Sequence, residues 1–168
     1  MKKIAGMVML AALAIACKPN ENTSEFTGNQ TVYALQQASQ YIVSGTVTFK
    51  EKRDGSALLA VDLTGTSGNS KYPVHLHLGD LTTQGASVAA LLNPLDGNLG
   101  KSETIITQLA DETIVTYASL IKLGACVKIH LAESGAGRDI ILAAGNVGAS
   151  VAKSSANGRL GVSVCQSN

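Results

Sequence analysis

Short runs in which apolar and polar residues alternate most constrain the fold of this chain. Over residues 41–50 every second residue, starting at Tyr41, is apolar or glycine, and most of those between are polar. The alternation resumes over residues 57–63, after the turn pair Asp54 and Gly55. Successive side chains of a β-strand point to opposite faces of the sheet. The pattern therefore predicts a β-hairpin with one buried face.

The same signals recur to the end of the chain. Further candidate strands are residues 74–78, 88–92, 104–107, 114–117, 125–131, 139–144 and 160–165. Residues 118–123 favour a helical turn, and the 17 glycines suit many tight turns. Seven to nine short strands at close spacing predict an all-β domain, an antiparallel Greek-key β-sandwich, over residues 41–168.

The amino terminus has the pattern of an export signal. Lys2 and Lys3 precede an apolar run over residues 4–16. That run is shorter than the about 20 residues that a membrane-spanning helix needs. Cys17 follows a small residue, so residues 1–16 resemble a bacterial lipoprotein signal peptide, in which Cys17 is acylated and begins the mature chain. The alternative is a plain secretory signal with an incidental cysteine.

Residues 17–40 are predicted to be the lipidated cysteine and a tether, although residues 31–40 suit either a short helix or an extended lead-in. Without the signal, 11 basic and 12 acidic residues remain. This balance excludes the basic stripe of a nucleic-acid-binding protein. Membrane attachment is therefore expected from the lipid on Cys17, which places the chain in a bacterial envelope. Lys18 lacks the aspartate of inner-membrane lipoproteins, which favours the outer membrane.

Three histidines, His75, His77 and His130, are the one group of residues in the sequence whose pattern suggests a functional site. Each alternates with apolar neighbours in a predicted strand and so points away from the apolar face. Side chains two residues apart on a strand lie about 6.5–7 Å apart, close enough for two imidazoles to converge on one ion. A third imidazole from a neighbouring strand would complete a site for copper or zinc. Alternatively, the three rings are separate and solvated.

Two cysteines, Cys126 and Cys165, remain when Cys17 carries the lipid. Both lie on the less apolar side of predicted strands, and export places them in an oxidising compartment. We therefore expect a disulfide, which would close a loop of about 40 residues and stabilise the fold by about 3–4 kcal/mol. Two unrelated thiols are the alternative.

Residues 43–148 resemble the CHRD (chordin-type) domains of bacterial exported proteins and lipoproteins. The matching stretches are VSGTVTF, VHLHLGD, LLNPLDGNLGKSE and GACVKIHLAESGAGRDIILAAGNVG. The resemblance implies a β-sandwich and no general enzymatic activity. No nucleophile elbow, phosphate-binding glycine loop or distinct carboxylate pair points to other catalysis.

A second resemblance is to copper–zinc superoxide dismutases, through GTVTF, the His-x-His strand ending in Gly79, and VKIH. It implies that His75, His77 and His130 correspond to three of four copper ligands, and that Arg159 corresponds to the arginine that guides superoxide. The chain departs from that family in having Leu91 near the expected bridging histidine and Ala86 near the expected disulfide cysteine. No histidine remains for a zinc site.

These observations favour a lipid-anchored, non-enzymatic β-sandwich that acts as a binding or structural module and holds copper through three histidines. A dismutase-like copper enzyme without the zinc site is the second reading. A periplasmic protein that buffers or delivers copper on the same scaffold is the third.

Overall fold

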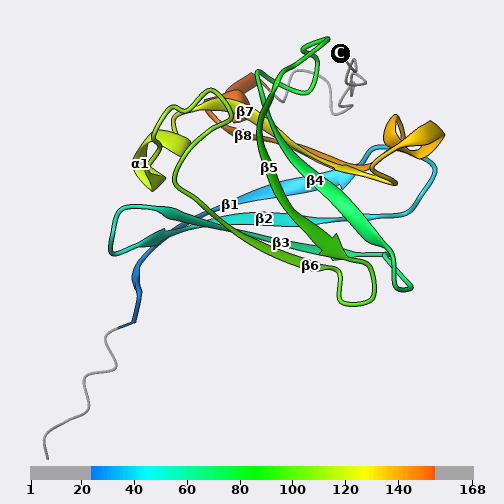
Figure 1. Cartoon of the computed structure of the whole chain (residues 1–168), viewed down its shortest axis with the longest axis horizontal. Coiled ribbons are helices and arrows are strands. Elements are labelled where there is room, and N and C mark those ends of the chain that lie inside the picture. Colours follow the sequence, from blue (N-terminus) through cyan, green and yellow to red (C-terminus); the bar gives the residue numbers. More distant parts are fainter. Residues whose placement is uncertain (1–23, 154–168) are drawn as a thin grey trace, which may run out of the picture.

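The computed structural model describes residues 24–153, in which eight strands close into one antiparallel barrel (Figure 1). The strands are β1 (Phe26–Gln37), β2 (Ser44–Lys52), β3 (Ala57–Thr64), β4 (Lys71–Leu78), β5 (Val88–Asp96), β6 (Lys101–Ile106), β7 (Gly124–His130) and β8 (Ile141–Gly148). Their order around the barrel is β1-β2-β3-β6-β5-β4-β7-β8. The predicted all-β antiparallel fold is confirmed, with one closed sheet where the sequence predicts a sandwich.

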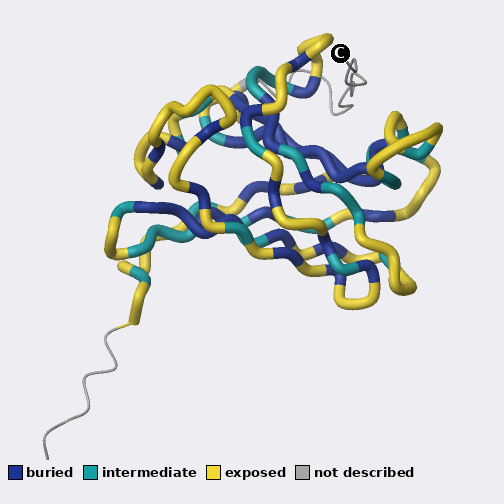
Figure 2. Tube along the Cα trace, in the orientation of Figure 1, coloured by how far each residue is buried: buried dark blue, intermediate teal, exposed yellow. Residues whose placement is uncertain are grey.

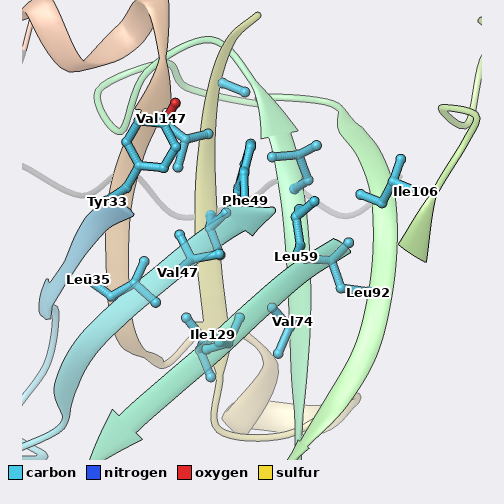
Figure 3. Close-up of a cluster of buried hydrophobic side chains, with 14 of the residues drawn as sticks. Tyr33, Leu35, Val47, Phe49, Leu59, Val74, Leu92, Ile106, Ile129 and Val147 are labelled. Atoms are coloured by element: carbon cyan, nitrogen blue, oxygen red, sulfur yellow. The ribbon is translucent and has the colours of Figure 1, made fainter. Parts of the chain in front are cut away.

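The barrel interior is filled by every second side chain of the strands, as the alternation requires. Val47 and Phe49 of β2 are fully buried, and the Phe49 ring meets the Tyr33 ring edge-on at 5.1 Å between centroids. Figure 3 shows this core, and Figure 2 shows buried and exposed residues alternating along the strands. Burial of these apolar side chains is the main stabilising contribution to the barrel.

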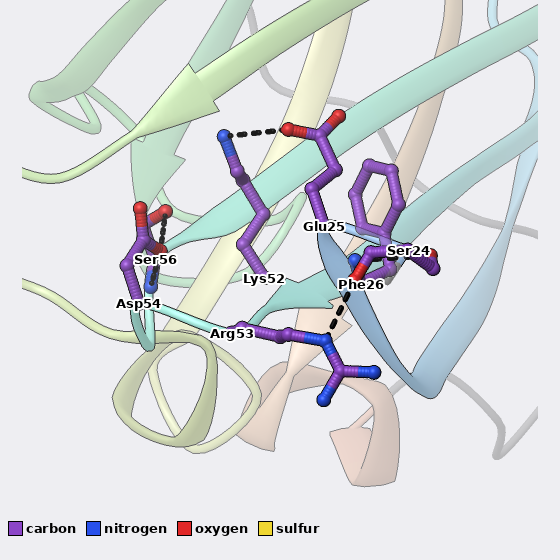
Figure 4. Close-up of polar contacts among 7 residues, drawn as sticks. All are labelled: Ser24, Glu25, Phe26, Lys52, Arg53, Asp54 and Ser56. Carbon is purple, nitrogen blue, oxygen red and sulfur yellow. Dashed lines mark hydrogen bonds and ion pairs between the residues drawn. The ribbon is translucent and has the colours of Figure 1, made fainter. Parts of the chain in front are cut away.

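Strand β1 begins in the predicted tether and continues into residues 31–37, for which the sequence suits either a short helix or an extended lead-in; the extended form is the one observed. Tyr33 and Leu35 face the core, and β1 pairs with β2 over residues 30–35 and with β8 at its end. Polar contacts fix its start to the β2–β3 turn, where Arg53 Nε donates to the Ser24 carbonyl at 2.6 Å and Lys52 pairs with Glu25 at 3.3 Å (Figure 4). The barrel therefore begins near residue 26. Two buried apolar residues, Tyr33 and Leu35, are enough for a strand here because β2 provides the backbone hydrogen bonds.

The connections differ from expectation at a few further points. Residues 114–117 form no strand; Ile114 makes an isolated bridge with Gln108, and α1 (Tyr117–Leu120) follows. Two 3₁₀ helices, η1 (Gly135–Arg138) and η2 (Ala149–Lys153), flank β8. The strand predicted at residues 160–165 lies outside the described residues. No helix between residues 24 and 153 is long and apolar enough to cross a membrane.

The pairing of β4 with β7, two strands far apart in sequence, positions the candidate site. Strand β4 lies between β5 and β7, and β7 in turn pairs with β8. In the β4–β7 ladder His75 faces Lys128 and His77 faces Cys126. Cross-strand partners project on the same side of a sheet. These four side chains, and His130 two residues beyond Lys128, therefore share the outer face of the barrel.

Candidate metal centre

The three histidines converge on the outer face of β4 and β7. One ring nitrogen from each of His75, His77 and His130 lies within 4.8 Å of the other two. The His75 ring is central, with its centroid 4.7 Å from that of His130 and 5.7 Å from that of His77. Among residues 24–153 this is the one group of histidine, cysteine and acidic side chains that could hold a metal ion.

Irregularities in the strand ladders occur at two of these histidines. The β4–β5 register shifts between Leu76 and His77, and the β7–β8 register shifts between Ile129 and His130. Such bulges change the direction of a side chain relative to a regular ladder, and they are common beside functional sites. Here they fall where two rings on different strands turn towards a third.

The histidines point away from the core, as predicted, yet two of them are not solvated. His77 and His130 are 0% and 2% exposed; Ala86 of the loop 79–87 contacts the first ring, and Arg138 of the segment 131–140 contacts the second. Leu81 anchors the first loop: it is fully buried against Cys126, Ile141 and Ala144, and its amide donates to Asn146 Oδ1 at 2.8 Å.

Glycine is required where this covering loop begins. Gly79 has a φ of +87°, and a Cβ there would lie 2.5 Å from the Thr83 hydroxyl oxygen. The chain turns back at this residue in a conformation that side chains other than glycine rarely adopt. The loop can therefore leave β4 directly after the histidines and fold over them.

Backbone carbonyls orient two of the rings. His77 Nδ1 lies 3.0 Å from the Ala86 carbonyl oxygen, and His130 Nδ1 lies 2.7 Å from that of Arg138. A carbonyl can only accept, so each Nδ1 carries the proton and donates it. In the neutral rings Nε2 then bears the lone pair. His130 Nε2 is buried and has no hydrogen-bond partner. A buried nitrogen of this kind is costly unless a ligand uses its lone pair.

The donor set fits a metal ion such as copper. Two nitrogens bound to one ion at about 2.0–2.1 Å can be at most about 4.2 Å apart. The observed upper limit of 4.8 Å needs only a small ring movement to meet this condition. Metal-ligating histidines commonly donate their other ring proton to a carbonyl, as His77 and His130 do here. The half-buried His75 leaves the group reachable from solvent.

The surroundings hold all three rings in the neutral form that binds metals. Burial, assisted by the His130 and His77 rings, lowers the pKa of His75 from 6.5 to about 4. Burial also lowers the pKa of His77 to about 4, against the opposing effect of the Ala86 carbonyl. The pKa of His130 is lowered by burial as well. His75 and His77 are therefore neutral and available as ligands in mildly acidic solution, and burial favours the neutral form of His130 as well.

For the metal-free chain, we expect the free energy of unfolding to fall as the pH decreases from 6.5 towards about 4. In this window the unfolded chain takes up protons on residues 75 and 77 that the folded chain does not bind, so acid favours unfolding. Urea denaturation in the presence of a chelator, at several pH values, measures the slope. The double variant His75→Asn, His77→Asn should have a shallower slope, and equal slopes would contradict this prediction.

The remaining predicted site residues are placed only in part. Cys126 is buried beneath the loop 79–87, but its expected disulfide partner Cys165 lies outside the described residues, as do Cys17 and Arg159. The disulfide, the lipid site and the guiding arginine therefore stay predictions. Leu91 of β5 is the cross-strand neighbour of His75 and is 73% exposed, so this position contributes no ligand.

Other features of the site went unrecognised in the sequence. The carbonyls of Ala86 and Arg138 are main-chain groups and leave no sequence signal. Lys128 is fully buried, although a lysine in an alternating strand normally indicates a solvated face. The one available signal was Leu81, an apolar residue within an otherwise polar turn, which indicates that the turn packs against the barrel.

Comparison with known proteins shows a partial similarity to a metalloenzyme. The chain is 32% identical over 76 residues to a cell surface Cu-Zn superoxide dismutase, number 4, of Candida albicans. The match covers 45% of this chain and 33% of that protein, so the chain spans about a third of the length of the curated relative. No protein-family model matches, so the resemblance to CHRD domains is not supported, and no solved structure matches. The chain is thus distantly similar, over part of its length, to a Cu-Zn superoxide dismutase.

Proposed function

We propose that this protein binds one copper ion through His75, His77 and His130, on a superoxide-dismutase-like β-barrel. The main support for this proposal is that His130 Nε2 is buried and has no hydrogen-bond partner. It lies in a group of three imidazoles whose ligand atoms are within 4.8 Å of one another. A structural role alone would leave this nitrogen desolvated and uncompensated.

The choice of copper follows from the ligands. Imidazole nitrogen suits copper and zinc, and a given site generally binds Cu²⁺ more tightly than Zn²⁺. Bound copper would supply one-electron redox chemistry. The chain's own residues orient the ligands: the Ala86 and Arg138 carbonyls fix two rings, and the covering loop excludes water from His77. His75 is only half-buried, so a small molecule would approach the site from the side on which His75 lies.

Superoxide dismutation is the second candidate function, and the partial similarity to a Cu-Zn superoxide dismutase favours it. The three nitrogens leave a coordination position for a small anion. Leu91, rather than a histidine, neighbours His75 on β5, which removes a fourth imidazole from that side. We therefore rank copper binding above turnover. The lipid anchor on Cys17 and the place in the bacterial envelope remain part of the proposal from sequence.

Copper loading of the purified chain tests both functions. We expect one copper ion per chain after loading and removal of excess metal, measured by elemental analysis. Superoxide removal is then assayed with the loaded chain and with His130→Ala. Activity that disappears in the variant would support dismutation, whereas bound copper without activity would favour a binding role. A chain that retains no copper would contradict the proposal.

A further inference from the structure

A buried lysine lies directly beside the three histidines. Lys128 is fully buried on the outer face of β7, two residues before His130 and opposite His75 in the β4–β7 ladder. Cross-strand partners have Cβ atoms about 4.5–5.5 Å apart, and same-face neighbours on one strand lie about 6.5–7 Å apart. The lysine side chain is therefore part of the immediate surroundings of any ion held by these rings.

A second cation lies on the covering segment. Arg138 ends η1, and its carbonyl holds His130, so its position is tied to that ligand. Burial is the main reason for the low pKa of each histidine; the charge of Lys128 further lowers the pKa of His77 and His130, and that of Arg138 further lowers the pKa of His75 and His130. Asp139 opposes them at His130 only, as the smallest of the effects there. Every ligand of the candidate site thus experiences at least one nearby positive charge.

On the basis of the proposed copper site, we infer that Lys128 and Arg138 make it selective for monovalent copper over divalent ions. Three neutral imidazoles bring no negative charge to offset the charge of the ion. Repulsion from the two cations then grows in proportion to the charge on the metal, so it penalises Cu²⁺ and Zn²⁺ about twice as much as Cu⁺. The penalty is large where burial excludes water, as it does around Lys128.

The number of ligands acts in the same direction. Cu²⁺ favours tetragonal geometry, which needs at least four donors. The cluster offers three nitrogens, and Leu91 occupies the neighbouring position on β5. Three nitrogens satisfy Cu⁺ without a further protein ligand. Charge and coordination number therefore both favour the reduced ion.

The test compares dissociation constants for Cu⁺, measured under anaerobic conditions against a Cu⁺ chelator, and for Cu²⁺, measured against glycine. Lys128→Met removes the charge while keeping a long side chain that fills similar space. We expect this variant to shift the ratio of the two constants at least tenfold towards Cu²⁺. For a one-electron couple this equals a potential about 59 mV lower. Lys122→Met is the matched control, because Lys122 is exposed and precedes the start of β7, whereas His130 is at its other end.

Arg138→Gln provides a second variant that does not depend on a buried substitution. Arg138 is exposed, and its carbonyl can still hold His130, so the fold should tolerate the change; the ratio should shift in the same direction. If both variants change the two constants equally, or leave both unchanged, the inference is overturned while the copper site stands. If the unmodified chain binds neither Cu⁺ nor Cu²⁺, the proposed function fails, and the inference with it.

Discussion

Replacing His77 with alanine is expected to weaken copper binding at least about 100-fold, since even loss of a ligand's hydrogen-bonding partner costs metal sites about 10- to 100-fold. His77 is fully buried, and its Nδ1 donates to the Ala86 carbonyl, so Nε2 bears the lone pair that a metal would use. The variant would leave only two imidazoles. Competition with a chromophoric copper chelator measures the loss.

Leu91→Ala is the matched control for this experiment. Leu91 neighbours His75 across the β4–β5 ladder, but its side chain is largely exposed and has no donor atom. Its truncation should leave copper stoichiometry and affinity unchanged. Copper that binds His77→Ala as tightly as it binds the unmodified chain would show that the ion is held elsewhere.

Phe49→Ala is expected to lower the free energy of unfolding by about 3–5 kcal/mol, the usual cost of truncating a buried phenylalanine. Phe49 is fully buried in the barrel, and its ring packs edge-on against Tyr33. The substitution would leave a cavity and would also remove the aromatic contact between β1 and β2. Since small domains are stable by only about 5–15 kcal/mol, this is a large part of the total.

Urea denaturation of the metal-free chain measures this effect, with Thr48→Ala as the control. Thr48 is adjacent to Phe49 on β2 but points to the other side of the sheet. We expect the control to change stability by less than about 1 kcal/mol. If the two variants lose similar free energies of unfolding, the assignment of Phe49 to the core face and of Thr48 to the other face would be wrong.

Local alternation was enough to predict most strands but not the one nearest the amino terminus. Apolar and polar residues alternate over the whole of residues 41–50, so the sequence predicts β2 directly. β1 has only Tyr33 and Leu35 as buried apolar anchors, amid polar neighbours that resemble a tether. Its stability comes from pairing with β2 and from the contacts of Ser24 and Glu25 with the turn that follows β2. Such long-range pairing leaves little trace in the local sequence.

The histidine cluster could be predicted only as a possibility. The alternation of side chains along a strand places His75 and His77 on the same outer face, and His130 on the outer face of its own strand. That β4 and β7 are neighbours, in the register that pairs His75 with Lys128, depends on the whole barrel topology. Burial of the cluster depends on loops that fold back over it. Neither property follows from the residues within the two strands.

X-ray absorption spectroscopy of the copper-loaded chain would identify the atoms bound to the metal and so test whether three imidazoles hold it. We expect three nitrogen ligands at about 2.0–2.1 Å, with the outer-shell scattering of imidazole rings. In His77→Ala this three-imidazole signature should be lost. A sulfur ligand at about 2.3 Å, the distance typical of a metal–thiolate bond, would assign the copper to a cysteine and rule out the three-histidine site.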